Sequence, residues 1–235
     1  MAFHTEDSAD NVIENRLRFF KIFDIDHEKI VALNQVHGTE IVEVGRDNCG
    51  EGALPGNALQ NADALITTRP GLTLCTYSAD CLLIYYVAID TPLVAIAHAG
   101  RQGTLGGMAE KVVKQIKARY GIKPGRLLTF LAPSICKNCY TVDSTLAEVF
   151  NHAGWGSSVY IEPTYGGLWN LNLAEINRAQ LIRAGLDKEN IDQSSICTSC
   201  RSDLFYSYRR ERGKTGRMMG FISLVAGRGE KKVGQ

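Results

Sequence analysis

The chain has 235 residues, a hydrophobic content of 45%, a charged content of 22% and a formal net charge of +1. These values are ordinary for a soluble globular domain with a sizeable core. The near-neutral charge gives no electrostatic support for nucleic-acid binding. No segment approaches the ~18 apolar residues of a membrane span, and the acidic N-terminus lacks the apolar core of a signal peptide. We therefore expect a cytoplasmic protein, monomeric or homodimeric, with neither nucleic-acid nor membrane partners.

The first half of the chain predicts one helix followed by several strands. Apolar side chains at helical spacing predict a helix from Ser8 or Asp10 to about Phe23. Residues 45–61 are rich in Gly and Pro, which predicts a lid or a disordered flap. Short apolar runs predict strands at 30–33, 39–44, 63–67, 73–77, 81–88 and 93–97.

The second half mixes strands and helices irregularly. Helices are predicted at 104–120, 144–152 and 173–184. Strands are predicted at 127–132, 168–171, 203–208 and 218–224. The Gly- and Lys-rich residues 225–235 predict a disordered tail. The pattern indicates a single α+β domain over residues 1–224, built on a mixed sheet or a pair of sheets.

Three metal-binding side chains lie where predicted strands begin or end. His37 follows one strand, Cys81 begins another and His98 ends a third. Taken singly, such residues are most often core or turn residues, because buried Cys needs no special explanation. Together they form a His₂Cys set, which suits a catalytic zinc ion that keeps one position open for water or substrate.

Other interpretations of these three residues remain. The same ligands suit copper, although five histidines are too few for a multicopper oxidase. Cys81 could instead be the nucleophile of a cysteine hydrolase, with His98 or His37 as its base. A non-catalytic metal-binding scaffold is a further alternative. Asp80, beside Cys81, is a candidate for substrate contact or proton transfer. Its alternatives are a structural turn residue or a partner that orients a ligand histidine.

An anion site is predicted next to His98. The Gly-rich stretch from Gly100 to Thr104 begins a predicted helix, where backbone N–H groups and the helix dipole favour negative charge. Arg101 adds a positive side chain at this point. A metal site beside an anion site indicates phosphate chemistry.

Two C-x-x-C pairs lie in the second half of the chain, Cys136/Cys139 and Cys197/Cys200. They could combine into a structural Cys₄ zinc site. However, 57 residues separate the pairs, far more than the ~15–20 residues of compact zinc ribbons. Neither pair has the strand-to-helix context of a thioredoxin-like redox motif.

Four collinear motifs resemble one known family. They read Gln35-Val-His-Gly38, Ala79-Asp-Cys81, His98-Ala-Gly100, and the stretch from Phe205-Tyr-Ser-Tyr-Arg-Arg210 to Thr215-Gly-Arg217. This pattern is similar to that of YfiH-like purine nucleoside phosphorylases, which are also known as polyphenol oxidase or laccase-domain proteins. The resemblance extends from the first helix to about Leu224 and covers nearly the whole chain.

The resemblance implies a single α+β domain similar to that of cytotoxic necrotizing factor deamidases. It implies that His37, Cys81 and His98 bind a metal, with zinc as the first expectation and copper as the second. The implied substrates are a purine nucleoside (adenosine, inosine or methylthioadenosine) and phosphate, with adenosine deamination as a second activity. The expected substrate and phosphate contacts are Gln35, Gln102 and Arg209.

The sequence departs from the family pattern at two places. Where the family usually has His-Ala-Gly-Trp-Arg-Gly, this chain has His98-Ala-Gly-Arg-Gln-Gly103. We therefore expect Arg101 to take the place of the family's phosphate-binding Arg. The sequence also starts at a point that resembles the end of the family's opening region, without its Arg-x-Gly-Gly segment.

Overall fold

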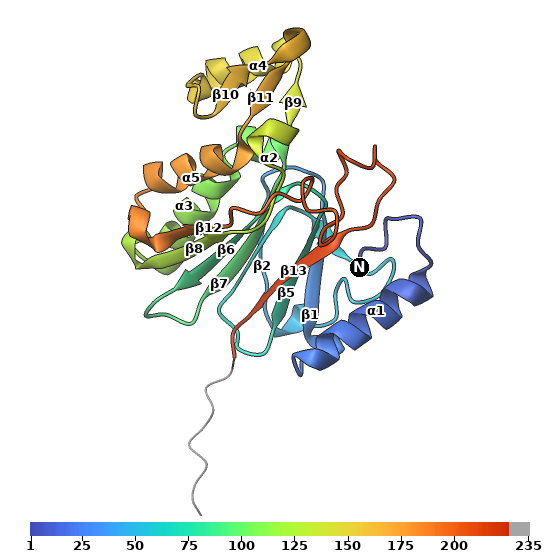
Figure 1. The fold of residues 1–235 in the computed structure, drawn as a ribbon. Helices are drawn as coiled ribbons and strands as arrows, with labels where there is room; N and C mark the ends of the chain where they lie inside the picture. Colours follow the sequence, from blue (N-terminus) through green and yellow to red (C-terminus); the bar gives the residue numbers. More distant parts are fainter. Residues whose placement is uncertain (226–235) are drawn as a thin grey trace, which may run out of the picture.

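Two β-sheets stacked face to face form the centre of this computed structural model, which describes residues 1–225 (Figure 1). The smaller sheet has the strand order β13 (Met218–Ser223), β5 (Thr73–Ser78), β1 (Ile30–Asn34), β3 (Leu59–Asn61). The larger sheet has the order β12 (Ile191–Gln193), β8 (Leu127–Leu131), β6 (Leu82–Ala88), β7 (Val94–Ala99), β4 (Ala64–Thr67), β2 (Ile41–Glu43). Both sheets mix parallel and antiparallel pairs, which confirms the predicted α+β class.

The two sheets share an apolar core because side chains alternate between the faces of each strand. In β7, Val94 and Ile96 face the smaller sheet and pack on Leu74 of β5. The neighbouring Ala95 and Ala97 belong to a second core on the opposite face. Small alanines on that face let helices approach closely.

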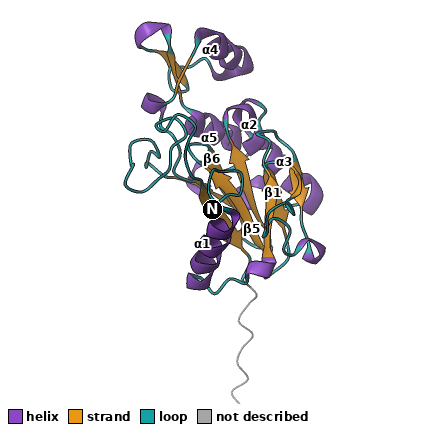
Figure 2. Ribbon diagram, turned by 90° about the vertical axis from the view of Figure 1, so that its right-hand side faces the viewer, coloured by secondary structure: helices purple, strands orange, loops and turns teal. Residues whose placement is uncertain are grey.

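Helices cover both outer faces of the stacked sheets, as Figures 1 and 2 show. On the smaller sheet lies α1 (Ala9–Ile22), capped by the Ser8 hydroxyl, which accepts the N–H of Asn11. The larger sheet is covered by α3 (Met108–Tyr120) and α5 (Leu173–Arg183). None of the helices within residues 1–225 is long and apolar enough to span a membrane.

A small unit projects from one end of the stacked sheets (Figures 1 and 2). It consists of a three-stranded antiparallel sheet and one helix with their own apolar core around Phe150 and Trp155. Its elements are β9 (Thr141–Val142), α4 (Ser144–Phe150), β10 (Ile161–Pro163) and β11 (Trp169–Leu171).

Three predictions about secondary structure were wrong. The helix predicted over 104–120 is two helices, α2 (Arg101–Leu105) and α3, because Gly107 has a φ of +80° between them. The strand predicted at 203–208 is a series of turns. Residues 45–61 are no flap: the buried guanidinium of Arg16 donates to the carbonyls of Gly52 and Ala53 and ties the segment to α1. The predicted disordered tail lies outside the described residues from 226 onward.

Candidate metal centre and substrate pocket

Cys81 and His98 face the same space because of the register of β6 and β7. Leu83 of β6 pairs with His98 of β7, and these antiparallel strands place Cys81 opposite Gly100. Side chains two residues apart in a strand point to the same face. The side chain of Cys81 therefore points toward the smaller sheet, as that of Leu83 does. The side chain of His98 points to that same side, as that of Ile96 does. Both side chains therefore lie at the end of the space between the two sheets.

His37 reaches this point from the smaller sheet, just after β1. Its φ of +61° lies in the left-handed region, which is uncommon for a residue with a side chain. The Asp63 carboxylate holds this turn by accepting the N–H groups of residues 36, 37 and 38 at 3.3, 3.0 and 2.6 Å. An energetically costly conformation held by surrounding contacts is frequent at functional sites.

Asp63 also orients His98. Its Oδ1 atom lies 2.9 Å from Nδ1 of His98, and its backbone carbonyl accepts the His98 N–H at 2.7 Å. Sequence reasoning missed Asp63. The only signal was a lone carboxylate at the first residue of a predicted strand, which by itself is uninformative. Its neighbour Ala64 pairs with Ala97 in the register of β4 and β7, and this pairing places Asp63 beside His98.

The three predicted ligands form a compact cluster. The ligand atoms of His37, Cys81 and His98 all lie within 4.8 Å of one another, and the two imidazole rings meet edge to face at 4.9 Å. Burial raises the pKa of the Cys81 thiol, but the charge of His98 and hydrogen bonding from His37 outweigh burial and lower the pKa to about 6. A thiolate is the metal-binding and nucleophilic form of cysteine.

The surroundings of the cluster fit a bound divalent cation. Gly100 leaves room there: a Cβ atom on it would lie 2.9 Å from Sγ of Cys81 and 3.3 Å from Cδ2 of His37. Two imidazoles and one thiolate are ligands that zinc and copper both accept. Asp63 supplies the carboxylate contact that metal-binding histidines commonly have on their other ring nitrogen.

The cluster lies on the wall of a pocket of about 770 Å³. The pocket brings together every site residue predicted from the sequence: Gln35, His37, Asp80, Cys81, His98, Arg101, Gln102 and Arg209. Its wall also includes residues that were not predicted, among them His4, Tyr140, Tyr208 and Arg217. A pocket of this size accommodates a small-molecule ligand.

Comparison with known proteins places this arrangement in a family. A sequence profile described as "Multi-copper polyphenol oxidoreductase laccase" matches residues 1–225. The purine nucleoside phosphorylase YlmD of Geobacillus stearothermophilus is 38% identical, over 94% of this chain and 82% of its own length. The chain belongs to this laccase-like YfiH family. Homologues in the family are named as enzymes, and the match confirms the resemblance that the four motifs indicated.

A solved structure and one further relative bear on fold and activity. The crystal structure of YlmD from Geobacillus stearothermophilus superposes with a TM-score of 0.92 and 37% identity, covering 96% of this chain and 84% of that chain. Adenosine deaminase RL5, from an unknown prokaryotic organism, is 30% identical over 90% of this chain and 81% of its own length. The fold is therefore that of the YfiH family, with mixed helices and sheets in one domain.

Asp80 lies on the pocket wall with an uncommon backbone conformation and a buried side chain. Its φ is +89°, and its buried carboxylate accepts three hydrogen bonds. The donors are the Thr198 hydroxyl at 2.6 Å, the Ser207 hydroxyl at 3.0 Å and the Arg209 backbone N–H at 2.7 Å. A carboxylate with this many partners has little capacity left for a substrate. The geometry favours the structural interpretation of Asp80 over proton transfer.

Gln35 lies on the pocket wall and binds the backbone of β5. Its amide nitrogen donates to the Tyr77 carbonyl at 2.9 Å, and its amide oxygen accepts the Tyr77 N–H at 2.8 Å. Both ends of the amide are thus paired with the backbone of β5. Gln35 shapes the pocket by joining the ends of β1 and β5, and each end of its amide keeps one further hydrogen-bonding position.

The predicted basic residues lie on different elements. Arg209 donates to the Thr141 carbonyl at 2.9 Å and stacks over the Tyr140 ring at 4.8 Å. Arg101 and Gln102 lie exposed in the first turn of α2, with Gly100 as the N-cap. Because α2 has only five residues, its dipole is short and the Arg101 side chain carries most of the positive charge there.

Proposed function

We propose that this protein is a zinc-dependent purine nucleoside phosphorylase with adenosine deamination as a second activity. The observation that carries the proposal is one pocket lined by a His₂Cys cluster and by basic side chains from α2 and from the 194–217 segment. The substrates are adenosine, inosine or methylthioadenosine together with phosphate. The names of the YlmD and RL5 relatives support both activities.

In phosphorolysis, a phosphate oxygen attacks C1′ of the ribose while the bond from C1′ to the purine nitrogen breaks. The bonding electron pair leaves with the purine, which takes up a proton. The products are the free base and ribose 1-phosphate, or 5-methylthioribose 1-phosphate when the substrate is methylthioadenosine. We assign phosphate contact to Arg101, because its guanidinium lines the pocket in the turn that follows His98. Arg209 is the second basic contact.

His37, Cys81 and His98 would hold the zinc ion. When bound, zinc supplies Lewis acidity toward substrate oxygens and acidifies water. Asp63 holds His98 through Nδ1, so the other ring nitrogen, Nε2, faces the cluster. Asp80 positions the backbone of Arg209 and so the wall that binds substrate. In deamination, water replaces the purine amino group and ammonia leaves, and no phosphate is needed.

Metal content and turnover of single variants test this assignment. We expect Cys81→Ala and His98→Ala to lose the pocket zinc and nucleoside turnover, with the circular dichroism spectrum retained because the two apolar cores do not depend on the site. The matched control is Cys49→Ala, since Cys49 is an exposed cysteine outside the pocket. Retained turnover in His98→Ala would contradict the proposal.

A cysteine hydrolase is the rival supported by an observation, the lowered pKa of Cys81 beside two imidazoles. The two functions respond differently to iodoacetamide. Zinc bound to Cys81 protects its thiol, so the zinc-loaded phosphorylase resists alkylation. An enzyme that turns over substrate with its pocket free of metal, and that iodoacetamide inactivates at Cys81, would be a hydrolase.

A further inference from the structure

The two C-x-x-C pairs, far apart in sequence, are brought together by the larger sheet. Strands β8 and β12 are parallel neighbours, with Leu131 paired to Gln193 at their ends. Each C-x-x-C pair follows one of these strands, so both leave the sheet at the same edge. The pairing continues as a parallel bridge between Ser134 and Cys197. The separation of 57 residues in sequence therefore says nothing about the distance in space.

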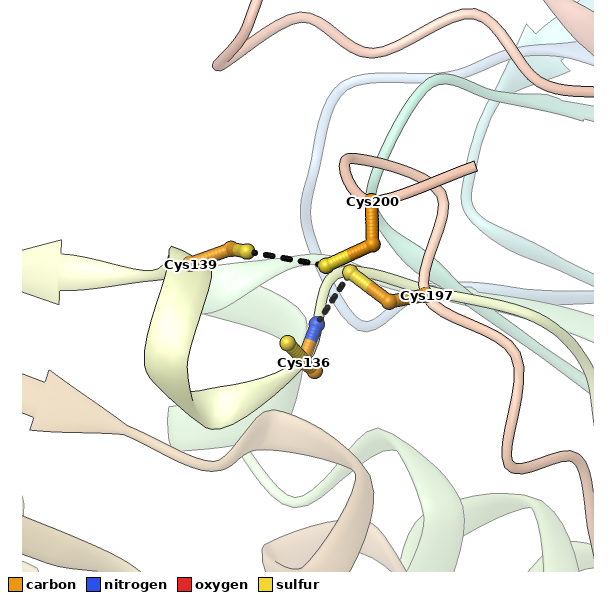
Figure 3. A group of neighbouring side chains, drawn as sticks. All are labelled: Cys136, Cys139, Cys197 and Cys200. Carbon is orange, nitrogen blue, oxygen red and sulfur yellow. Dashed lines mark hydrogen bonds between the residues drawn. The ribbon is translucent and has the colours of Figure 1, made fainter. Parts of the chain in front are cut away.

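The four sulfur atoms converge on one point (Figure 3). Their Sγ atoms all lie within 4.8 Å of one another, and those of Cys139 and Cys200 are 3.4 Å apart. A disulfide needs about 2.05 Å, so this pair is not bonded. Four thiolates held about 2.3 Å from a tetrahedral zinc ion lie about 3.8 Å from one another. The observed spacing suits that arrangement.

The backbone around the sulfurs is also shaped for a metal. The Cys136 N–H points at Sγ of Cys197 at 3.2 Å, a contact that stabilises a thiolate ligand. Each pair closes a turn: the Cys139 N–H donates to the Cys136 carbonyl, and the Arg201 N–H donates to the Cys197 carbonyl, both at 3.1 Å. These turns present the two cysteines of each pair on the same side.

Side-chain contacts also hold the two turns. Arg210 donates to the carbonyls of Thr198 and Ser199 inside the second turn, both at 2.9 Å. Lys137, in the first turn, donates to the Ser158 carbonyl at 2.7 Å and pairs with Glu162 at 2.9 Å. The turns that carry the cysteines are therefore held by contacts to their surroundings.

We propose that Cys136, Cys139, Cys197 and Cys200 bind one structural zinc ion, separate from the pocket cluster. Four protein ligands leave no open position, as is typical of structural sites. Binding replaces the thiol protons and transfers no electrons. The site stands independently of the proposed phosphorylase activity, since none of its ligands lines the pocket.

The consequence of this zinc ion is that it anchors one wall of the pocket. Between β12 and β13, residues 194–217 form neither helix nor regular strand. This segment carries the donors to Asp80 and places Tyr208 and Arg217 on the pocket. Most backbone hydrogen bonds that this segment donates stay within it; those of Ser194 and Thr198 reach Leu131 and Ser134. A metal joining the segment to the turn after β8 therefore restricts its movement.

Zinc, iron and copper counted per chain test the proposal. We expect about two zinc ions in the wild type and about one in the double variant Cys136→Ser/Cys200→Ser. Cys81→Ala should also hold about one, and the ion that it keeps should be bound by thiolates alone. Cys49→Ser is the matched control, because this exposed cysteine belongs to neither cluster, and it should keep the wild-type content.

Unchanged zinc in the double variant would overturn the proposal, as would iron in place of zinc. If the double variant does not fold, zinc binding by the four cysteines is tested in the Cys81→Ala protein, which keeps all four. Titration with a mercurial should release its zinc as the four thiols react. A protein purified without reductant that lacks this zinc and carries a Cys139–Cys200 disulfide, seen as a loss of about 2 Da in mass, would also overturn the proposal.

Limited proteolysis tests whether the zinc ion anchors residues 194–217. In the double variant, limited proteolysis should cut within residues 194–217 at least about tenfold faster than in the wild type, because opening of this segment becomes easier. Cleavage there at the wild-type rate, in a variant that has lost zinc, would overturn the anchoring role.

Discussion

The Nδ1 atom of His98 lies 2.9 Å from the Oδ1 atom of Asp63, and both side chains are almost fully buried. This contact fixes the ring so that its remaining nitrogen faces Cys81. The same carboxylate holds the turn that carries His37. One acidic residue thus organises two of the three proposed metal ligands from different sheets. Hydrogen bonding to His98 also helps to hold the pKa of Asp63 below its usual value, against the raising effect of burial.

Replacing Asp63 should therefore weaken metal binding without removing a ligand. We expect Asp63→Asn to bind zinc in the pocket roughly 10- to 100-fold more weakly, because the amide offers a poorer acceptor to the His98 N–H. Competition with a zinc-binding dye measures the change. Asp90→Asn is the control, since Asp90 pairs with Arg126 on the surface, and its zinc affinity should match the wild type. Equal affinities in both variants would exclude an orienting role for Asp63.

Gly100 tests the space that the proposed metal occupies. In Gly100→Ala, the new Cβ would lie 2.9 Å from Sγ of Cys81, closer than real contacts allow, so the ligand must shift. We expect loss of the pocket zinc and of turnover. Gly45→Ala is the matched control: nothing lies within 4 Å of its added Cβ, and its φ of −129° suits alanine. A Gly100→Ala variant with normal zinc content would show that the cluster does not bind the metal.

The part of the site that could be predicted from the sequence consists of residues at the ends of strands. Short apolar runs located the strands that carry Cys81 and His98, and the four motifs located the rest of the family pattern. The role of Asp63 could not be predicted from the sequence, because it depends on the register of β4 against β7. For a similar reason, little in the sequence supported a site formed by the two C-x-x-C pairs. The pairs are brought together by the parallel pairing of β8 and β12, which is a long-range contact.

The error at 203–208 has a different physical origin. A short run of apolar and aromatic residues indicated a strand, yet Leu204, Tyr206 and Tyr208 are all more than half exposed. No neighbouring strand pairs with this segment within residues 1–225. Its backbone is instead held by side-chain contacts, chiefly those of Asp80 and Arg210. A local apolar run cannot distinguish a strand from a turn segment that is held by such contacts.

Asp80 should act through structure and not through proton transfer. Removing its carboxylate in Asp80→Ala leaves two buried hydroxyls and one N–H without their acceptor, which should lower the free energy of unfolding by about 3 kcal/mol. The KM for nucleoside should rise as the wall with Arg209 loosens. Chemical denaturation measures stability, and Asp203→Ala, in an exposed ion pair, should unfold like the wild type. Unchanged stability with a collapsed kcat would instead indicate a catalytic carboxylate.

Arg101 should determine phosphate affinity. Loss of a charge-assisted contact costs about 1.5–3 kcal/mol, so Arg101→Ala should raise the KM for phosphate roughly ten- to a hundredfold. Deamination uses no phosphate and should change little. Gln102→Arg, which restores the usual family residue, should retain or raise phosphorolysis. Arg119→Ala, on the exposed face of α3, is the control. Equal loss of both activities in Arg101→Ala would mean that Arg101 supports the metal cluster and not phosphate.

The central claim is phosphorolysis of purine nucleosides at the His37–Cys81–His98 cluster. Its most direct test is base release from adenosine, inosine and methylthioadenosine, with and without phosphate, on protein of measured zinc content. The account predicts that the base and the corresponding sugar 1-phosphate appear in equal amounts only when phosphate is present, and in proportion to the zinc bound at the pocket. Base release that is independent of phosphate, or no release by fully zinc-loaded protein, would contradict it.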